Sequence, residues 1–220
     1  MPLVGMARGG ACRASWTSHI EDFDYVIISA GQWFFRPLIF HFNDTPVSCH
    51  ICEIENITAV NTFYGYKMAF QTAFKAILGL DKYKGVTLLR TFSPAHFENG
   101  DWDKGGNCPR TKPYGDDEAR LEGYILEMYM SQVREFRAVQ EMAKKRGLEF
   151  RLLDTTRAMV MRPDGHPNYY GHSPTANASI ADCVHWCLPG PVDTWNEFLQ
   201  DMIRKDGERS LSDDEIGSKT

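Results

Sequence analysis

The chain has no apolar run of the roughly 20 residues that a membrane-spanning helix needs. Residues 1–18 contain arginines but no apolar stretch, so they are not a signal peptide. Basic residues are outnumbered, with 24 Lys and Arg against 29 Asp and Glu, and the net charge of −5 argues against a nucleic-acid partner. The sequence also shows no internal repeat and no interdomain linker. What is present, 220 residues of which 43% are hydrophobic, predicts one domain with a sizeable core.

Cysteines and glycosylation sequons give the chain a secretory character. N-linked sequons begin at Asn56 and Asn177. The six cysteines are Cys12, Cys49, Cys52, Cys108, Cys183 and Cys187. Two close-set pairs allow a zinc site, and the Cys-x-x-Cys pair allows a redox motif. The sequons indicate an oxidising compartment and therefore favour disulfides. We expect no metal and no cofactor.

Strand and helix patterns alternate along the chain. Buried strands are predicted at residues 23–30, 85–91 and 149–153, and amphipathic helices at residues 61–78 and 116–146. A capping box at Thr194 and Glu197 predicts a last helix that ends at about Lys205, before a polar, disordered tail. The alternation predicts an α/β fold, a three-layer αβα sandwich with a mainly parallel sheet. In such sheets the site lies at the carboxyl ends of the strands.

The strongest candidate site is a carboxylate three residues before an imidazole, Asp182 and His185. Cys183 and Cys187 stand on either side of His185, and a stiff Leu-Pro-Gly-Pro turn follows. The carboxylate would accept from one ring nitrogen and fix the tautomer, leaving the other nitrogen to take a proton from a hydroxyl. The alternative is a structural histidine held by a nearby acid. A catalytic pair of this kind needs a nucleophilic serine, and the sequence offers no convincing one.

Two further loops follow predicted strands and carry suitable side chains. Gly31 permits close approach of a substrate, and its N–H would point at an oxyanion; a simple strand-ending turn is the alternative. In a second loop, Asn99 is a candidate oxyanion donor and His96 a candidate ligand for sugar hydroxyls, unless this is an ordinary surface loop. Trp33 and Trp102 offer aromatic faces that suit sugar rings, or they are core and rim aromatics.

Three blocks together resemble the trichome-birefringence-like family of plant polysaccharide O-acetyltransferases, and most closely its xyloglucan branch. They are ISAGQWF at residues 28–34, FSPAHFENGDWDKGGNC at residues 92–108 and DCVHWCLPGPVDTWN at residues 182–196. The resemblance extends over roughly residues 23–204. It implies a fold related to SGNH-type esterases, a lumenal Golgi location, and an acetyl donor and a polysaccharide acceptor as partners.

The resemblance also assigns roles to individual residues. It implies a double displacement in which a serine takes an acetyl group from a donor and passes it to a sugar hydroxyl. Asp182 matches the acid and His185 the base of the family's triad, and Gly31 matches an oxyanion-hole block. Cys108 and Cys183 match a disulfide that holds the catalytic loop, whereas the upstream partner of Cys187 is missing.

The family's nucleophile block is the main departure. No Gly-Asp-Ser occurs in the sequence, and the nearest string, Gly-Asp-Trp at residues 100–102, lacks the hydroxyl. The family's membrane anchor is missing as well. We therefore expect an atypical segment at residues 1–18, the C-terminal part of the domain at 19–205 without its first strand, and a tail at 206–220. The alternatives to an acetyltransferase are an acetyl-esterase, with water as acceptor, and a catalytically dead glycan-binding fragment.

Overall fold

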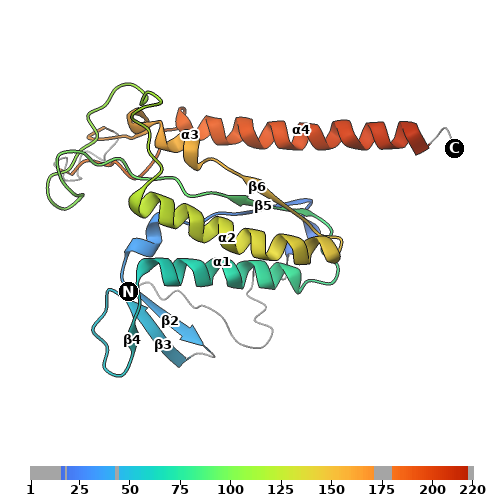
Figure 1. The fold of residues 1–220 in the computed structure, drawn as a ribbon, viewed down its shortest axis with the longest axis horizontal. Coiled ribbons are helices and arrows are strands. Elements are labelled where there is room, and N and C mark those ends of the chain that lie inside the picture. Colours follow the sequence, from blue (N-terminus) through green and yellow to red (C-terminus); the bar gives the residue numbers. More distant parts are fainter. Residues whose placement is uncertain (1–15, 18, 43–44, 171–179, 218–220) are drawn as a thin grey trace. The chain divides into compact units, whose positions relative to one another are not determined.

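The computed structural model describes residues 16–17, 19–42, 45–170 and 180–217. Most of the atypical N-terminal segment and the predicted glycosylation site Asn177 lie outside the described residues. The chain divides into two compact units (Figure 1). Unit 1 comprises Met1–Ser93 and Leu121–Thr156, and unit 2 comprises Pro94–Arg120 and Arg157–Thr220. Each unit is described by itself.

Unit 1 is built on a parallel sheet of three strands. These are β1 (Tyr25–Ile28), β5 (Val86–Arg90) and β6 (Glu149–Leu153), in the order β1-β5-β6. The central strand is the most buried, since Thr87, Leu88 and Leu89 are almost inaccessible to solvent. The parallel sheet and its three strands confirm the α/β class predicted from the sequence.

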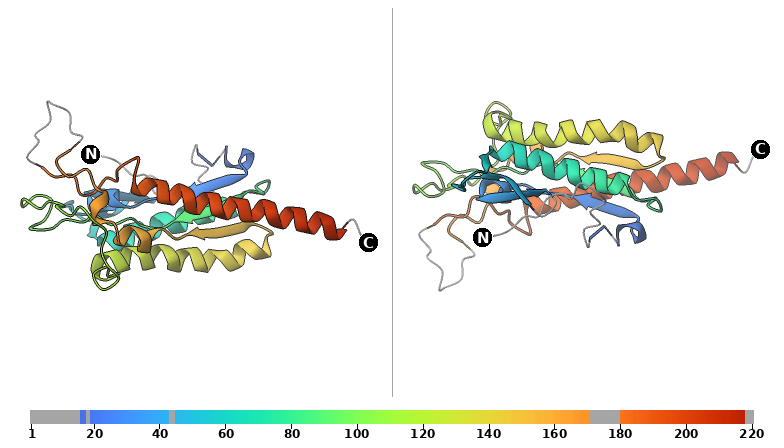
Figure 2. Two further views of the ribbon diagram at one scale, coloured as in Figure 1. Left: turned by 90° about the horizontal axis from the view of Figure 1, so that it is seen from above. Right: turned by 90° about the horizontal axis from the view of Figure 1, so that it is seen from below.

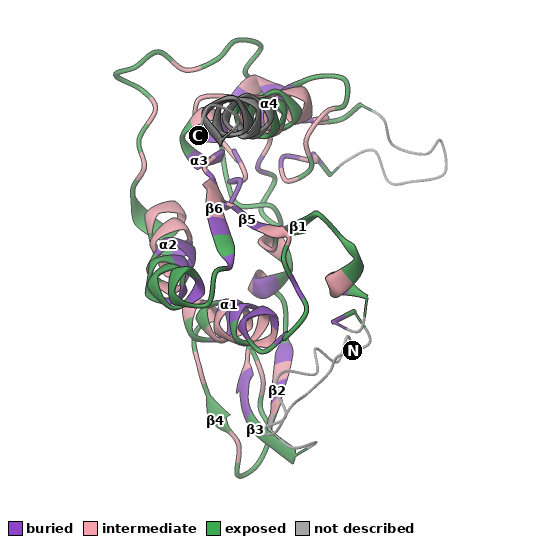
Figure 3. Ribbon diagram, turned by 90° about the vertical axis from the view of Figure 1, so that its right-hand side faces the viewer, coloured by how far each residue is buried: buried purple, intermediate pink, exposed green. Residues whose placement is uncertain are grey.

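Two long helices cover this sheet, α1 (Thr62–Leu78) and α2 (Gly123–Lys145), which run side by side (Figures 1 and 2). Both helices pack on β6 through one ring: Phe150 lies 6.0 Å from Phe74 of α1 and 6.5 Å from Phe136 of α2, between ring centroids. Their buried residues turn toward the sheet and toward each other (Figure 3). The third layer of the predicted sandwich stays a prediction, because the remaining long helix belongs to unit 2.

The ends of the two helices differ in how well the sequence predicted them. Helix α1 begins where the side chain of Asn61 accepts from Tyr64 N, at 2.9 Å, and ends at Gly79 as expected. Helix α2 was predicted from residue 116 but begins at Gly123. Residues 115–119 instead form a separate turn around Glu118, and the φ of 55° at Gly123 interrupts the helical path.

A second, small sheet in unit 1 was not predicted. It contains β2 (Leu38–Phe42), β3 (Thr45–His50) and β4 (Thr58–Ala59); β2 pairs antiparallel with β3, and β3 pairs parallel with β4. Strand β2 packs on α1 through Phe40, whose ring occupies the place that a Cβ at Gly65 would take. This glycine is therefore required for the contact between the small sheet and the helix layer.

Unit 2 contains a long loop at residues 94–120, the 3-10 turn η3 (Pro163–Gly165) and helix α4 (Pro191–Gly217), with most of α3 (Thr156–Val160). The capping box expected at Thr194 is wrong. The helix starts earlier because Pro191 opens it and the Asp193 carboxylate accepts from Gly190 N, at 2.7 Å. The end expected at about Lys205, before a disordered tail, is corrected to Gly217: no proline interrupts the helix.

No helix within the described ranges is long and apolar enough to cross a bilayer.

Candidate active site

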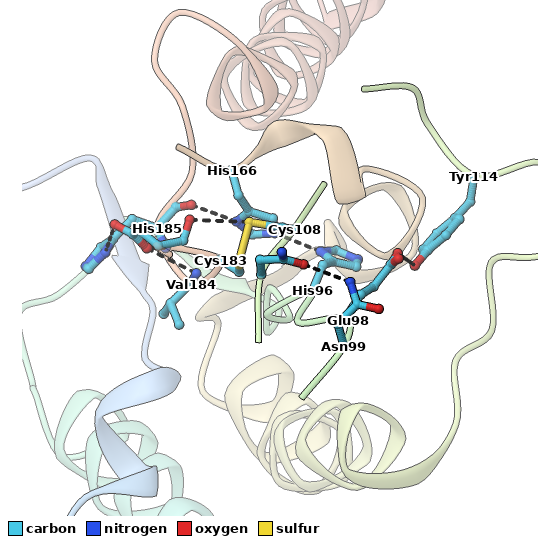
Figure 4. The surroundings of a disulfide bond; sticks show 11 residues. His96, Glu98, Asn99, Cys108, Tyr114, His166, Cys183, Val184 and His185 are labelled. Atoms are coloured by element: carbon cyan, nitrogen blue, oxygen red, sulfur yellow. Dashed lines mark hydrogen bonds and ion pairs between the residues drawn. A yellow bond between two sulfur atoms is a disulfide. The ribbon is translucent and has the colours of Figure 1, made fainter. Parts of the chain in front are cut away.

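Asp182 and His185 form a hydrogen-bonded acid–imidazole pair in the loop that precedes α4. Figure 4 shows His185 near the disulfide of Cys108 and Cys183. Nδ1 of His185 lies 2.8 Å from Oδ2 of Asp182. The other carboxylate oxygen, Oδ1, accepts from two backbone amides, His185 N at 2.9 Å and Val184 N at 3.2 Å. Because a carboxylate only accepts, Nδ1 carries the hydrogen and Nε2 of the neutral ring presents its lone pair.

The surroundings of Asp182 favour its ionised form. Burial alone would raise the pKa of this half-buried carboxyl, but the His185 amide, the His185 imidazole and the Val184 amide outweigh burial and hold the pKa below its usual range. Asp182 is thus an anion at neutral pH, able to stabilise an imidazolium on His185. This is the chemistry that the spacing of the two residues predicted.

His185 points its ring into solvent, with 79% of the side chain exposed, whereas only 22% of Asp182 is exposed. Within the described part of the chain, no side chain or backbone group hydrogen bonds its Nε2. The nitrogen that would exchange a proton with a substrate is therefore accessible, and the ring is held only by the carboxylate and by its own backbone.

A disulfide fixes the loop beside this pair. Cys108 and Cys183 are joined, as the family resemblance implied, and Cys183 is completely buried. The carbonyl of Cys183 also accepts from His96 N, at 3.1 Å. On the other side of the disulfide, Asp182 exchanges two backbone hydrogen bonds with Asn168, at 2.8 and 2.9 Å. The acid is thus held by a covalent link and a short antiparallel bridge.

The remaining described cysteines rule out the four-sulfur zinc site. Cys49 and Cys52 form a second disulfide, in unit 1, and Cys187 has no sulfur partner among the described residues. In the turn that follows, the predicted glycosylation residue Asn56 is exposed. Its modification stays a prediction. No group of three His, Cys, Asp or Glu side chains in the described ranges is arranged around a common point that could hold a metal ion.

His96 does not lie on the surface, and the prediction that it is an exposed ligand for sugar hydroxyls is wrong. Only 7% of the residue is exposed. Its Nδ1 lies 2.8 Å from Nε2 of His166, and its Nε2 lies 3.1 Å from the carbonyl of Val160. Both ring nitrogens of His96 therefore face groups inside unit 2 rather than solvent. Burial, with the neighbouring imidazole, lowers the pKa of His96 to about 4.

The other candidates in the long loop differ in exposure. Asn99 has a φ of 62° and donates from its side chain to Asn107 Oδ1, at 3.0 Å, so this amide shapes the loop itself. Trp102 is 65% exposed. Its aromatic face is free to contact a ligand, and its role in glycan binding stays a prediction, as does that of Asn99 in an oxyanion hole.

Gly31 and Trp33 belong to unit 1, where they follow β1 at its carboxyl end. The neighbouring Gln32 donates to the carbonyl of Ser93, at 3.2 Å, so the segments after β1 and β5 meet as the parallel sheet predicted. A Cβ at Gly31 would lie 3.2 Å from the ring of Phe92. Trp33 is 65% exposed and stacks on Arg36. Convergence of these residues with His185 of unit 2 stays a prediction.

The sequence analysis missed His166, which contacts the backbone of the candidate base. His166 lies at the end of η3, and its Nδ1 is 2.7 Å from the carbonyl oxygen of His185. Its ring also packs on Trp186, with centroids 4.2 Å apart. No local pattern marks His166, because it stands 19 residues before His185 in the chain.

Comparison with known proteins gives a family match over most of the chain. Residues 8–202 match PC-Esterase, the GDSL/SGNH-like acyl-esterase family found in Pmr5 and Cas1p. Protein trichome birefringence-like 19 of Arabidopsis thaliana is 50% identical over 198 residues, which are 90% of this chain and 46% of that protein. Xyloglucan O-acetyltransferase 4 of Populus trichocarpa is 44% identical over 193 residues, 87% of this chain and 45% of that protein.

The chain spans about half the length of the curated relatives it matches. Xyloglucan O-acetyltransferase 2 of Arabidopsis thaliana, for instance, is 40% identical over 199 residues, 89% of this chain and 47% of that protein. These matches confirm the resemblance stated from the three sequence blocks. The matched residues include the parallel sheet and the loop of Asp182 and His185, and the chain belongs to the PC-esterase family of GDSL/SGNH-like acyl-esterases.

Proposed function

We propose that this chain is the acid–base part of a polysaccharide O-acetyltransferase. The observation that carries the proposal is the contact of 2.8 Å between His185 Nδ1 and the ionised Asp182, made in a member of an acyl-esterase family. This contact leaves Nε2 exposed as a proton acceptor for a hydroxyl. Relatives named xyloglucan O-acetyltransferases favour xyloglucan as the acceptor polysaccharide.

The reaction has two steps in which His185 moves one proton each way. A serine hydroxyl gives its proton to Nε2 while its oxygen attacks the acetyl carbonyl of the donor, and the donor's leaving group departs with that proton. A sugar hydroxyl then gives its proton to Nε2 and attacks the acetyl-serine. The serine oxygen leaves and takes the proton back, which restores the enzyme. Asp182 stabilises the imidazolium that forms in both steps.

The nucleophilic serine is not in a Gly-Asp-Ser string of these 220 residues. The proposal assigns it to the part of the protein that corresponds to the remaining length of the relatives. Gly31, with Asn99, would support the oxyanion, and Trp33 and Trp102, both exposed, would contact the glycan. The two disulfides support an oxidising compartment, and we infer the lumenal side of the Golgi.

A second candidate is an acetyl-esterase, which uses the same pair with water as the acceptor. The exposure of His185 favours this reading, because an open site admits water as readily as a sugar hydroxyl. A third is a glycan-binding protein without catalysis, which the absence of a Gly-Asp-Ser string favours.

Product analysis on the native protein separates the three functions. The intact mass and the 5′ end of the native transcript define the protein to be expressed. It is then incubated with an acetyl donor and unacetylated xyloglucan, and the polysaccharide and free acetate are measured by NMR. Acetyl groups on xyloglucan are expected. Free acetate that accumulates independently of xyloglucan identifies an esterase, and binding of xyloglucan with no turnover identifies a binding protein; either result contradicts the proposal.

A further inference from the structure

The loop that carries Asp182 and His185 runs antiparallel to a segment at residues 165–168, in which Gly165 and His166 are buried. Its first anchor is the double backbone hydrogen bond between Asp182 and Asn168. Its last anchor is Cys187 N, which donates to the carbonyl of Gly165 at 2.9 Å. Between these anchors the carbonyl of His185 faces a side chain rather than a backbone amide.

That side chain is His166, and we propose that it is a positioning residue for His185, whose backbone carbonyl it holds through Nδ1–H at 2.7 Å. The inference rests on the proposed role of His185 as the acid–base residue. His166 itself is only 8% exposed and directly follows η3. Figure 4 shows its ring beside the backbone of His185. It contacts the loop and does not touch a reacting atom.

The backbone anchor matters because the His185 ring has little else to hold it. Among the described residues, Asp182 makes the only side-chain hydrogen bond to the His185 ring, and 79% of that side chain is exposed. Rotation of the His185 peptide would swing its Cα–Cβ bond and take Nδ1 away from the carboxylate. A hydrogen bond to the peptide carbonyl opposes that rotation.

Packing holds His166 in turn. The ring of Trp186 lies 4.2 Å from that of His166, with 39° between their planes, and it meets His96 edge-on at 5.7 Å. Trp186 also covers Gly165, where a Cβ would come within 3.1 Å of the indole. The residue that follows His185 is thus packed against His166, the residue that holds the His185 carbonyl, which ties the loop to its anchor.

The buried imidazoles of His96 and His166 make three contacts but carry only two ring hydrogens when both are neutral. His96 Nε2 and His166 Nδ1 face carbonyl oxygens, which only accept, and the proposal assigns a hydrogen to each of these two nitrogens. Two neutral rings supply those two hydrogens and none for the contact of 2.8 Å between the rings. In this assignment the contact between the rings gains its hydrogen when the pair takes up one proton, and the hydrogen bond to the His185 carbonyl is present in both states.

A conservative pair of variants separates positioning from packing. His166→Asn places an amide N–H near the position of Nδ1 and keeps the donor to the His185 carbonyl. His166→Gln places its amide one bond further out, near Nε2, and leaves that carbonyl without its donor. Both variants remove the imidazole and its packing on Trp186, so a role in packing alone affects them alike.

The readout is the ring tautomer of His185 in the 220-residue chain, from 15N chemical shifts near pH 7. Wild type and His166→Asn are expected to hold the Nδ1–H form. In His166→Gln the ratio of Nδ1–H to Nε2–H should fall by about fivefold or more, because a neutral hydrogen bond of about 1 kcal/mol corresponds to a factor of that order. Equal tautomer ratios in the two variants would overturn the proposal.

A measurement on the wild type tests the same proposal even if one of the variants does not fold. Through-bond coupling between His166 15Nδ1 and the 13C carbonyl of His185 is expected, and a His166 ring protonated only on Nε2 contradicts the proposal. The native acetyltransferase adds a second arm: His166→Gln should lower kcat at unchanged KM, and His166→Asn should restore it. A changed tautomer with unchanged turnover would refute the proposed function while leaving the positioning intact.

Discussion

The buried histidine His96 makes the stability of the fold depend on pH between neutrality and mild acid. Burial, reinforced by the neighbouring His166, lowers the pKa of His96 from its ordinary 6.5 to about 4. The hydrogen bond to the Val160 carbonyl, then Asp164 and Glu98, act in the opposite direction but do not compensate. On acidification, His96 is therefore protonated at a lower pH in the folded protein than in the unfolded chain.

The sign and size of the effect follow from this difference. The lowered pKa contributes stability that is complete above pH 6.5 and is lost as the pH falls toward 4, because the unfolded chain takes up the proton first. One pKa unit corresponds to about 1.4 kcal/mol, so the full contribution is about 3 kcal/mol. At pH 5 His96 is protonated in most unfolded molecules but in few folded ones, so between pH 7 and pH 5 it should account for a loss of about 2 kcal/mol.

Urea unfolding at pH 7.0, 6.0 and 5.0 measures this slope. The variant His96→Gln removes the titrating group, and its free energy of unfolding should fall by about 2 kcal/mol less than that of the wild type over this range. The comparison of slopes holds even if the variant is less stable at every pH. His19→Gln, which changes one exposed imidazole, is the matched control.

Equal losses of unfolding free energy between pH 7 and pH 5 in wild type and His96→Gln would show that His96 does not produce this pH dependence. A wild type that gains stability on acidification, relative to the variant, would show something more specific. The hydrogen bond that forms between His96 and His166 on protonation would then stabilise the charged pair by more than burial destabilises it. The pair would be charged at neutral pH.

Three further substitutions test the site and its supports. Asp182→Asn keeps the shape of the acid but removes its charge, and acetyl transfer by the native protein should fall by about 10⁴-fold in kcat with little change in KM; a loss below tenfold would contradict the triad role. Gly165→Ala forces a Cβ against the ring and the proline that pack on it, and should cost about 1–3 kcal/mol in urea unfolding; equal stability would contradict that packing. Cys108→Ser opens the disulfide to Cys183, which closes a separation of 75 residues, and should cost about 2–5 kcal/mol; a thermal midpoint unaffected by reductant in the wild type would contradict this.

The sequence predicted the elements whose signals are local. Alternating strands and helices predicted the parallel sheet, and the spacing of Asp182 and His185 predicted an acid–imidazole pair that the structure contains. The small sheet was missed although its hairpin has a sequence signal: the mostly apolar run 38–42 precedes two turn-forming residues, Asn43-Asp44. That signal was available and was overlooked.

The errors at the site have a different physical origin. A histidine in a loop rich in Gly, Pro and Asp resembles a surface residue, so His96 was expected in solvent. Its burial depends on contacts with Val160 and His166, each more than 60 residues away in the chain. The contact between His166 and the His185 carbonyl is likewise created only by the fold. Contacts of this range leave no periodicity or spacing that a sequence pattern could show.

The most direct test of the account is acetyl transfer by the native protein carrying His185→Ala. The measurement is the initial rate of acetyl incorporation into xyloglucan, with His19→Ala as the control for an exposed imidazole and xyloglucan binding measured in parallel. The account predicts a loss of at least about 10³-fold in the rate, with binding retained, because the proton acceptor is gone. Unchanged transfer by His185→Ala would contradict the assignment of the Asp182–His185 pair as the acid–base machinery.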